Sequence, residues 1–358
     1  MGWPHVDIAR VCGSHVVSFC EERIVTTALT LVCPETPSIQ DGDLLFRCSR
    51  CLRVSGAIPE CDDNCEISDQ RCSGCGAMVY KARGVWRSLS AARREQLAPF
   101  LAKYEEIREW EGRGSAHPAF YLALPFADLT GRFSGQWKIR ARSFRYLQSK
   151  ILPRLEREYG SRFRVLDIGA GNGWLSYRLA LLGYRPVAVD LCCNAWDGLE
   201  AAEHYASVLP EFFPRVEAEM DALPFSEAQF DVAIFNASFH YSTNYERTLS
   251  EVLRCLRPGG TILILDSPTY RLTEHGEKMR EERKIQLRMP CGPAGQGVPT
   301  GDFLTPRTLE RLSDLGVRWT PHLAWYGLQW FLRPWVARMK GRRAPSQFFI
   351  YEGQTETA

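Results

Sequence analysis

Residues 163–174 read FRVLDIGAGNGW, and this stretch decides the fold. Its first half is a short, nearly continuous apolar run, which is typical of a β-strand buried on both faces. Gly169, Gly171 and Gly173 follow directly, and a helical pattern begins at Trp174. Glycines at such a turn let the backbone approach a ligand closely, and the N-terminus of the next helix favours a polar or anionic group. The stretch therefore predicts a strand, a ligand-binding loop and a helix.

The alternation of strands and helices continues along the chain. Strand-sized apolar runs occupy residues 163–169, 185–191, 214–221, 230–236 and 259–266. Helical patterns separate these runs, as expected for a parallel sheet with helices on both faces. The sequence therefore predicts a doubly wound α/β domain over residues 161–358.

The residues around the glycine loop restrict the ligand. Asp190 ends the second predicted strand, where a carboxylate can accept two hydrogen bonds from a ribose diol. The dinucleotide fingerprint G-x-G-x-x-G requires glycine at position 174, but this chain has Trp174 there. An NAD-dependent oxidoreductase is therefore disfavoured. Asp167 places a negative charge directly before the turn, which suits a cationic amino group better than a pyrophosphate. We infer a ligand that carries both adenosine and an ammonium group.

Four stretches resemble the class I S-adenosylmethionine-dependent methyltransferases, in particular the type 11 group with its Rossmann-like sheet. They are VLDIGAGNGWLS (165–176), AVDL (188–191), DALPFSEAQFDVAIFNASFHY (221–241) and LRPGGTILILD (256–266). The resemblance implies that S-adenosylmethionine is the cofactor. In the family's pattern the methionine end is held by Asp167, Gly169, Gly171 and Gly173, the ribose by Asp190, the adenine edge by Asp221 and Ala222, and Asn236 lies beneath the cofactor.

The chemistry of this class needs few catalytic groups. Methyl transfer from a sulfonium is an in-line displacement with a good leaving group, so positioning of the two reactants can suffice. His240 lies in the segment that follows the fourth predicted strand and is the best candidate for a catalytic general base. The alternative is that His240 caps or packs the following helix. The Asn-Pro-Pro-Tyr signature of enzymes that methylate adenine or glutamine amide nitrogen is absent, because Ala237 and Ser238 follow Asn236.

The cysteines indicate a metal site. Six of the 13 cysteines fall between residues 48 and 75. Two C-x-x-C pairs, Cys48 with Cys51 and Cys72 with Cys75, have the spacing of a zinc ribbon, and four thiolates around one zinc leave no open position for catalysis. We therefore expect a structural zinc, in a segment that resembles the zinc-ribbon activator family of methyltransferases. Cys61 and Cys65 lie between the pairs and either replace one of them or remain free thiols.

The remaining segments have weaker patterns. We expect a poorly ordered extension at 1–42, the zinc ribbon at 43–88 and a helical linker or lid at 89–160, with helices near 90–111 and 136–159. The linker carries a run of basic residues that forms either a solvated helix face or a contact with an anionic group. The basic residues are Arg132, Lys138, Arg140, Arg142, Arg145, Lys150 and Arg154.

A second basic segment lies near the C-terminus. Residues 318–343 interleave tryptophans with arginines and lysines, and are read as a helical insert near the rim of the site. The segment is a packed helix, an interfacial surface for a lipid-like substrate, or a stacking surface for RNA.

The composition sets outer limits on the function. The 358 residues carry a net charge of only +2, and no apolar run approaches the roughly 20 residues that span a bilayer. Charges interrupt the first residues, so we expect no secretory signal and a cytoplasmic enzyme. The favoured function is S-adenosylmethionine-dependent methylation of a small or lipid-like metabolite. The alternatives are methylation of RNA or protein in the translation apparatus, and a non-catalytic zinc-ribbon adaptor.

Overall fold

The computed structural model describes residues 43–58, 69–291 and 301–355. The expected extension at 1–42 lies outside the described residues, and so do Cys61 and Cys65. Residues 39–358 form one compact unit. Among the described residues, no helix combines the length and the apolar character that a bilayer crossing requires.

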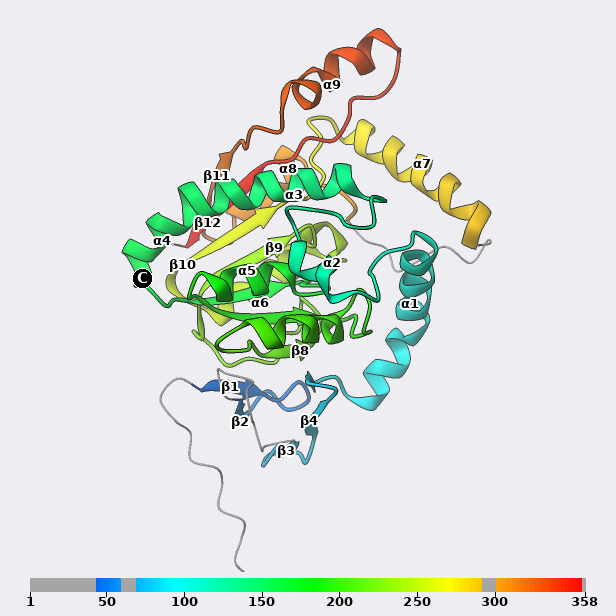
Figure 1. The fold of residues 1–358 in the computed structure, drawn as a ribbon. Coiled ribbons are helices and arrows are strands. Elements are labelled where there is room, and N and C mark those ends of the chain that lie inside the picture. Colours follow the sequence, from blue (N-terminus) through cyan, green and yellow to red (C-terminus); the bar gives the residue numbers. More distant parts are fainter. Residues whose placement is uncertain (1–42, 59–68, 292–300, 356–358) are drawn as a thin grey trace, which may run out of the picture. The chain divides into compact units, whose positions relative to one another are not determined.

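A ten-stranded sheet forms the centre of this unit (Figure 1). Its strand order is β11-β12-β10-β9-β6-β7-β8-β5-β4-β3. The six strands from β10 to β5 in this order run parallel, and antiparallel pairs extend the sheet at both ends. The strands are β3 (Asp69–Arg71), β4 (Met78–Ala82), β5 (Val85–Arg87), β6 (Arg164–Ile168), β7 (Arg185–Asp190), β8 (Arg215–Glu217), β9 (Phe230–Asn236), β10 (Leu256–Leu265), β11 (Val317–His322) and β12 (Ile350–Thr355). A separate hairpin pairs β1 (Leu44–Arg47) with β2 (Val54–Ile58).

Helices connect and cover the strands. The α-helices are α1 (Ala91–Trp110), α2 (Pro118–Ala123), α3 (Ser134–Tyr146), α4 (Leu152–Tyr159), α5 (Trp174–Leu181), α6 (Tyr245–Cys255), α7 (Thr273–Cys291), α8 (Pro306–Ser313) and α9 (Leu328–Met339). A π-helical turn, η1 (Leu147–Ile151), joins α3 to α4, and two 3₁₀ segments are η2 (Leu199–Val208) and η3 (Phe239–Tyr241). The predicted helix at 136–159 therefore exists as α3, η1 and α4 in succession.

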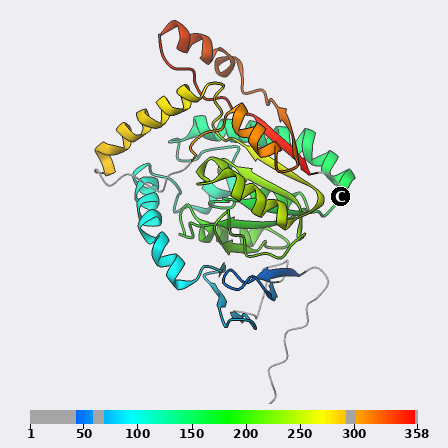
Figure 2. The same ribbon diagram turned by 180° about the vertical axis from the view of Figure 1, so that it is seen from behind.

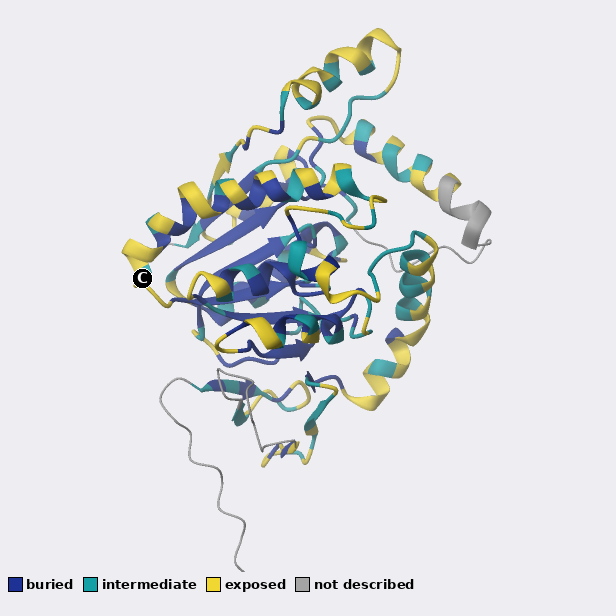
Figure 3. Ribbon diagram, in the orientation of Figure 1, coloured by how far each residue is buried: buried dark blue, intermediate teal, exposed yellow. Residues whose placement is uncertain are grey.

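The core divides into two layers because successive strand residues point to opposite faces of the sheet. Val165 of β6 packs in a layer with residues of α2 to α5 and η2, whereas Leu166 packs in a layer with residues of α6 and α8. Both faces of the sheet are therefore covered, and Figure 3 shows the central strands coloured as buried. The arrangement confirms the predicted doubly wound α/β class.

The cysteine-rich segment is built into this sheet. Strand β5 pairs in parallel with β8, placing Trp86 opposite Val216. Trp86, which is fully buried, shares one core layer with Phe46 and Val216. On the β1 side, Arg47 N–H donates to the Pro224 carbonyl at 3.0 Å. The described residues between 43 and 88 thus continue the hydrogen bonding and the core of the central sheet.

The chain also differs from the sequence-based expectation near its C-terminus. Residues 317–322, expected within a helical insert, form strand β11 at the edge of the sheet. Only 328–339 is helical, and Pro334 lies inside that helix. The reason is pairing with a distant segment: all six residues of β11 pair antiparallel with β12, from Val317 opposite Thr355 to His322 opposite Ile350.

Candidate functional site

The glycine loop after β6 lies where the order of the sheet reverses. From β6 the chain proceeds to β7 and β8 on one side, and then to β9 and β10 on the other. Ligands of open α/β sheets bind at the carboxyl ends of the strands at such a switch point. Gly169, Gly171 and Gly173 have φ values of 71°, 55° and 73°, in the left-handed region that favours glycine. The sequence of the loop is therefore required by its backbone.

Gly169 is also required by packing. A Cβ built at this position would lie 2.3 Å from Cβ of Ser238, at the end of the neighbouring strand β9. Ser238 is held in place because its hydroxyl donates to the carbonyl of Ile168 at 2.5 Å. The close approach keeps the ends of β6 and β9 together at the base of the site.

Two carboxylates flank the loop. Asp190 Oδ2 accepts the N–H of Gly171 at 2.8 Å, and Oδ1 accepts the N–H of Cys192 at 2.8 Å. Asp167 is fully buried; one of its oxygens accepts the Ser176 hydroxyl at 2.7 Å, and Oδ1 has no hydrogen-bond partner among the described residues. Burial raises the pKa of Asp167 to about 7. A cation bound nearby would favour the ionised form of this carboxyl group and lower its pKa.

A cavity of about 340 Å³ opens beside the loop. Of the residues expected from the sequence, Gly169, Gly171, Asp190, Asp221 and Asn236 line it. The other expected residues of the site do not line it: they are Asp167, Gly173, Ala222 and His240. Five of the expected cofactor-binding residues thus line one cavity. Each of the remaining three is adjacent in sequence to a residue that lines it.

His240 is buried and does not line this cavity. It is 8% exposed, and its Nδ1 lies 3.4 Å from the Ser267 hydroxyl oxygen. Burial lowers the pKa of the imidazole to about 3, with the positive charge of Arg283 contributing. The main-chain carbonyl of His240 accepts the N–H of Asp302 at 2.8 Å, so the residue fastens the segment after β9 to the segment before α8. This environment corresponds to the packing role that the sequence left open.

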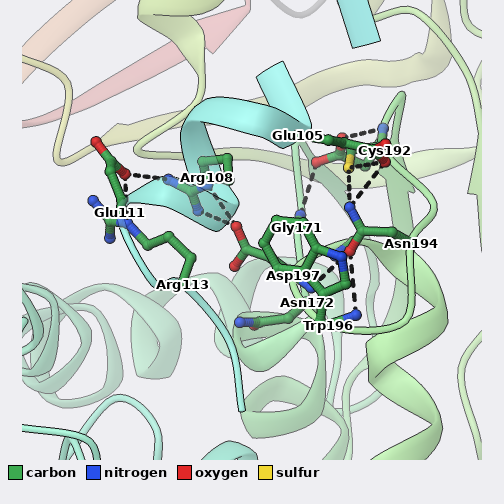
Figure 4. Close-up of polar contacts among 12 residues, drawn as sticks. Glu105, Arg108, Glu111, Arg113, Gly171, Asn172, Cys192, Asn194, Trp196 and Asp197 are labelled. Atoms are coloured by element: carbon green, nitrogen blue, oxygen red, sulfur yellow. Dashed lines mark hydrogen bonds and ion pairs between the residues drawn. The ribbon is translucent and has the colours of Figure 1, made fainter. Parts of the chain in front are cut away.

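Helix α1 forms a wall of the cavity that the motifs did not indicate. Arg108 reaches Asp197 in the segment after β7, with nitrogen and oxygen 2.5 Å apart. Glu105, one turn earlier, accepts the side-chain amide of Asn194 at 2.9 Å (Figure 4). Asn194 Oδ1 in turn accepts the N–H of Asp197 at 2.8 Å. These contacts fix α1 beside the loop that follows Asp190.

The sequence of α1 contains a pattern that indicates a helix, and one face of this helix lies toward the cavity. Leu97, Leu101, Tyr104 and Arg108 recur at steps of four, three and four residues, and all four line the cavity. This periodicity predicts a helix, but nothing in it says which part of the sheet the helix covers.

Aromatic and cationic side chains form another part of the lining. Trp174 packs edge-to-face against Trp137, with ring centroids 5.9 Å apart. The guanidinium of Arg140 lies 4.7 Å from the ring centroid of the same Trp137. Burial lowers the pKa of Arg140, and the like charges of Arg113 and Arg108 act in the same direction. One member of the basic run at 132–154 thus lies at the site rather than on a solvated face.

The four outer cysteines of the ribbon come together as the spacing predicts. Cys48 and Cys75 have sulfur atoms 3.5 Å apart, and Cys51 and Cys72 have sulfur atoms 3.4 Å apart. All four sulfurs lie within 4.8 Å of one another. Four thiolates at about 2.3 Å from one zinc ion are separated by about 3.8 Å, so the cluster has the dimensions of a tetrahedral site.

The glycine loop, the cavity and the strand order define a doubly wound α/β domain with a ligand site at its switch point. Residues 166–264 match the family described as methyltransferase domain. The fold and the matched segment agree, since the segment runs from β6 to β10 and contains the glycine loop, Asp190, Asp221 and Asn236.

Similar proteins extend this finding. An uncharacterized protein of Mycobacterium bovis is 33% identical over 156 residues, which are 43% of this chain and 55% of that protein. A malonyl-[acyl-carrier protein] O-methyltransferase of Erwinia pyrifoliae is 31% identical over 29% of this chain and 37% of that protein. The chain thus spans about half the length, or less, of the curated relatives it matches.

Solved structures resemble the chain at lower identity. The 1,6-didemethyltoxoflavin-N1-methyltransferase of Burkholderia thailandensis, solved with S-adenosylhomocysteine, is 17% identical, with a TM-score of 0.42 over 81% of this chain and all of that one. The YcgJ protein of Bacillus subtilis is 14% identical, with a TM-score of 0.43 over 58% of this chain and 98% of that one.

Proposed function

We propose that the protein transfers the methyl group of S-adenosylmethionine to a small or lipid-like acceptor bound in the cavity. The observation that carries the proposal is that Gly169, Gly171 and Asp190 line one cavity at the switch point of the sheet, inside the segment that matches methyltransferase domains. The carboxylate of such a site can bind a ribose diol, and the backbone of the glycine loop can approach the rest of the ligand closely.

The residues present fit S-adenosylmethionine. When bound, it supplies an electrophilic methyl group on a positively charged sulfur. Gly169, Gly171 and Gly173 carry no side chain that would obstruct the methionine end. Asp167, buried directly before the loop with one unpartnered oxygen, would attract an ammonium group there once it is ionised. Asp190 retains unused lone pairs for the ribose hydroxyls after accepting one backbone N–H on each oxygen. Asp221 and Ala222 take the adenine edge, and Asn236 lies beneath the cofactor.

The acceptor occupies the part of the cavity under α1 and α3. Its walls include Tyr104, Phe133 and Trp137, which bind apolar or planar groups, and Arg140. Enclosure by these helices excludes water and holds the acceptor in line with the transferred methyl. No proton transfer is assigned to His240, because its imidazole does not line the cavity. The relative named for methylating a malonyl group on its carrier agrees with a small acyl or carboxylate acceptor.

We also infer that Cys48, Cys51, Cys72 and Cys75 hold a structural zinc ion. Four thiolates complete its coordination, so the metal contributes folding free energy and no reaction step. The support is the mutual approach of the four sulfurs.

The proposal is tested by calorimetric titration of the full chain with S-adenosylhomocysteine. We expect binding by the unmodified protein and a loss of about tenfold or more for Asp190→Ala, because two ribose hydrogen bonds to a charged group are removed. Asp314→Ala, at an exposed carboxylate beyond α8, is the matched control and should bind normally. A folded protein that does not bind the compound would refute the proposal.

The acceptor class is then tested by transfer of labelled methyl into small-molecule, RNA and protein fractions of the native host. Label in the small-molecule fraction supports the proposal. Label confined to RNA or protein would assign the macromolecular alternative, and binding without any transfer would assign the non-catalytic adaptor.

A further inference from the structure

Helix α9 presents a continuous apolar stripe to solvent. Six large apolar side chains recur at steps of three, one, three, one and three residues, which places them on one face of the helix. Their exposures are 63% for Leu328, 59% for Phe331, 42% for Leu332, 65% for Trp335, 45% for Val336 and 86% for Met339. No residue of α9 is buried. A stripe of this spacing normally faces a core, so here it lacks the surface that would cover it.

The orientation of the stripe is fixed from the opposite face. Trp330 stacks on Phe348 with ring centroids 5.2 Å apart, and Arg333 lies over the ring of Trp330 at 3.2 Å. Arg333 also donates a hydrogen bond to the carbonyl of Ser346. In Figures 1 and 2, α9 extends away from the central sheet, and Figure 3 shows it largely exposed. The apolar face is therefore held outward by the contacts of the polar face.

The charged residues of the sequence segment that carries the stripe have one sign. The sequence from Leu315 to Tyr351 contains no aspartate or glutamate. Its cations are Arg318, Arg333, Arg338, Lys340, Arg342 and Arg343. Arg338, Lys340 and Arg342 are exposed at the end of the helix, whereas Arg343 is paired with Glu282 of α7 at 2.7 Å. An apolar face bordered by unopposed cations complements a surface that is apolar inside and anionic at its boundary.

We propose that α9 is an in-plane anchor that binds the chain to a membrane surface rich in anionic lipids. Apposition of two α9 helices from two copies would bring like charges together, which disfavours a second copy as the occupant. RNA would find cations and the rings of Phe331 and Trp335, but four of the six stripe side chains are aliphatic and would remain uncovered by stacked bases. These four are Leu328, Leu332, Val336 and Met339. Leucine, phenylalanine and tryptophan on one face with arginine and lysine beside them are the composition of helices that lie in the interface.

The test is co-sedimentation of the full chain with vesicles of phosphatidylcholine alone and with vesicles containing one quarter phosphatidylglycerol. We expect strong binding to the anionic vesicles, weak binding to the zwitterionic ones, and weakening as salt is raised from 50 to 500 mM. Trp335→Glu should lower the partition coefficient about tenfold or more. The combined Arg338→Gln and Lys340→Gln variant should lower binding to anionic vesicles about fivefold for each charge.

The matched control is Trp110→Glu on α1, because Trp110 is 61% exposed and does not line the cavity. It should bind vesicles as the unmodified protein does. Equal binding to both vesicle types, or none to either, would overturn the proposal. A dimer dissociated by Trp335→Glu without vesicle binding would assign a second copy, and an RNA mobility shift without vesicle binding would assign RNA. Membrane binding is measured without methyl transfer, so it stands or fails independently of the proposed function.

Discussion

Gly169 shows how a single residue joins the fold to the site. Its φ of 71° costs any other residue backbone free energy, and its missing Cβ lets Ser238 approach the loop. Gly169→Ala should therefore lower the free energy of unfolding by about 3 kcal/mol, the sum of a left-handed backbone penalty and a steric clash. It should also weaken S-adenosylhomocysteine binding, because the loop must move. Urea unfolding and calorimetry measure the two effects.

Gly183 separates the two causes. It has a φ of 88°, and a Cβ there would meet no atom within 4 Å. Gly183→Ala should cost only about 1 kcal/mol, the backbone penalty alone, and leave binding unchanged. Equal losses at the two positions would show that the contact with Ser238 contributes nothing.

Residues that follow a local rule could be predicted from the sequence. The four cysteines are set by their spacing, and the glycines with Asp190 by the order of strand, loop and helix. The side chain of His240 could not be placed in this way. Its position in the chain after β9 is local, but its burial beside Ser267 depends on segments distant in sequence. A residue can follow the right strand without lining the cavity.

At the scale of elements, α1 is attached to the site by ion pairs and hydrogen bonds to β8 and to the segments after β7 and β8. Two of these ion pairs have nitrogen and oxygen 2.5 Å apart, Arg93 with Glu219 and Arg108 with Asp197. Both side chains are largely buried only in the pair between Arg108 and Asp197. Arg108→Met should lower stability by about 3 kcal/mol, because it leaves the carboxylate of Asp197 buried without its partner. Adding Asp197→Asn should restore part of the loss, giving a coupling of about 2 kcal/mol in a double-mutant cycle. Binding of S-adenosylhomocysteine should weaken in both single variants as α1 loosens.

An exposed ion pair provides the comparison for α1. Lys284 and Glu281 of α7 lie 3.1 Å apart, and both are more than half exposed. Lys284→Met should change stability by less than about 0.5 kcal/mol. Strict additivity of the Arg108 and Asp197 substitutions would mean that this pair does not hold the helix.

The elements themselves were predictable where their periodicity is strong and their partners are near in the chain. The strands β6, β7, β9 and β10 and the helices α1 and α3 to α4 belong to this group. Strand β11 was missed because its tryptophan, arginine and histidine are typical of several structures, and its pairing with β12 fixes it from about 30 residues away. The parallel pairing of β5 with β8 joins segments that are still further apart in the chain.

At the scale of the whole described unit, the ribbon and the sheet should unfold together. Strands β3 to β5 continue the ten-stranded sheet, and Glu217 of β8 pairs with Arg87 and with Arg94. A metal bound by the four cysteines would therefore stabilise the central sheet as well. We expect about one zinc per chain, and removal by a chelator should lower the melting temperature by about 10 °C in a single calorimetric transition. Cys72→Ala should lose the metal and shift the transition likewise, whereas Cys193→Ala, outside the cluster, should keep the metal. Two separate transitions, with only the smaller one sensitive to the chelator, would show instead that the ribbon folds as an independent domain.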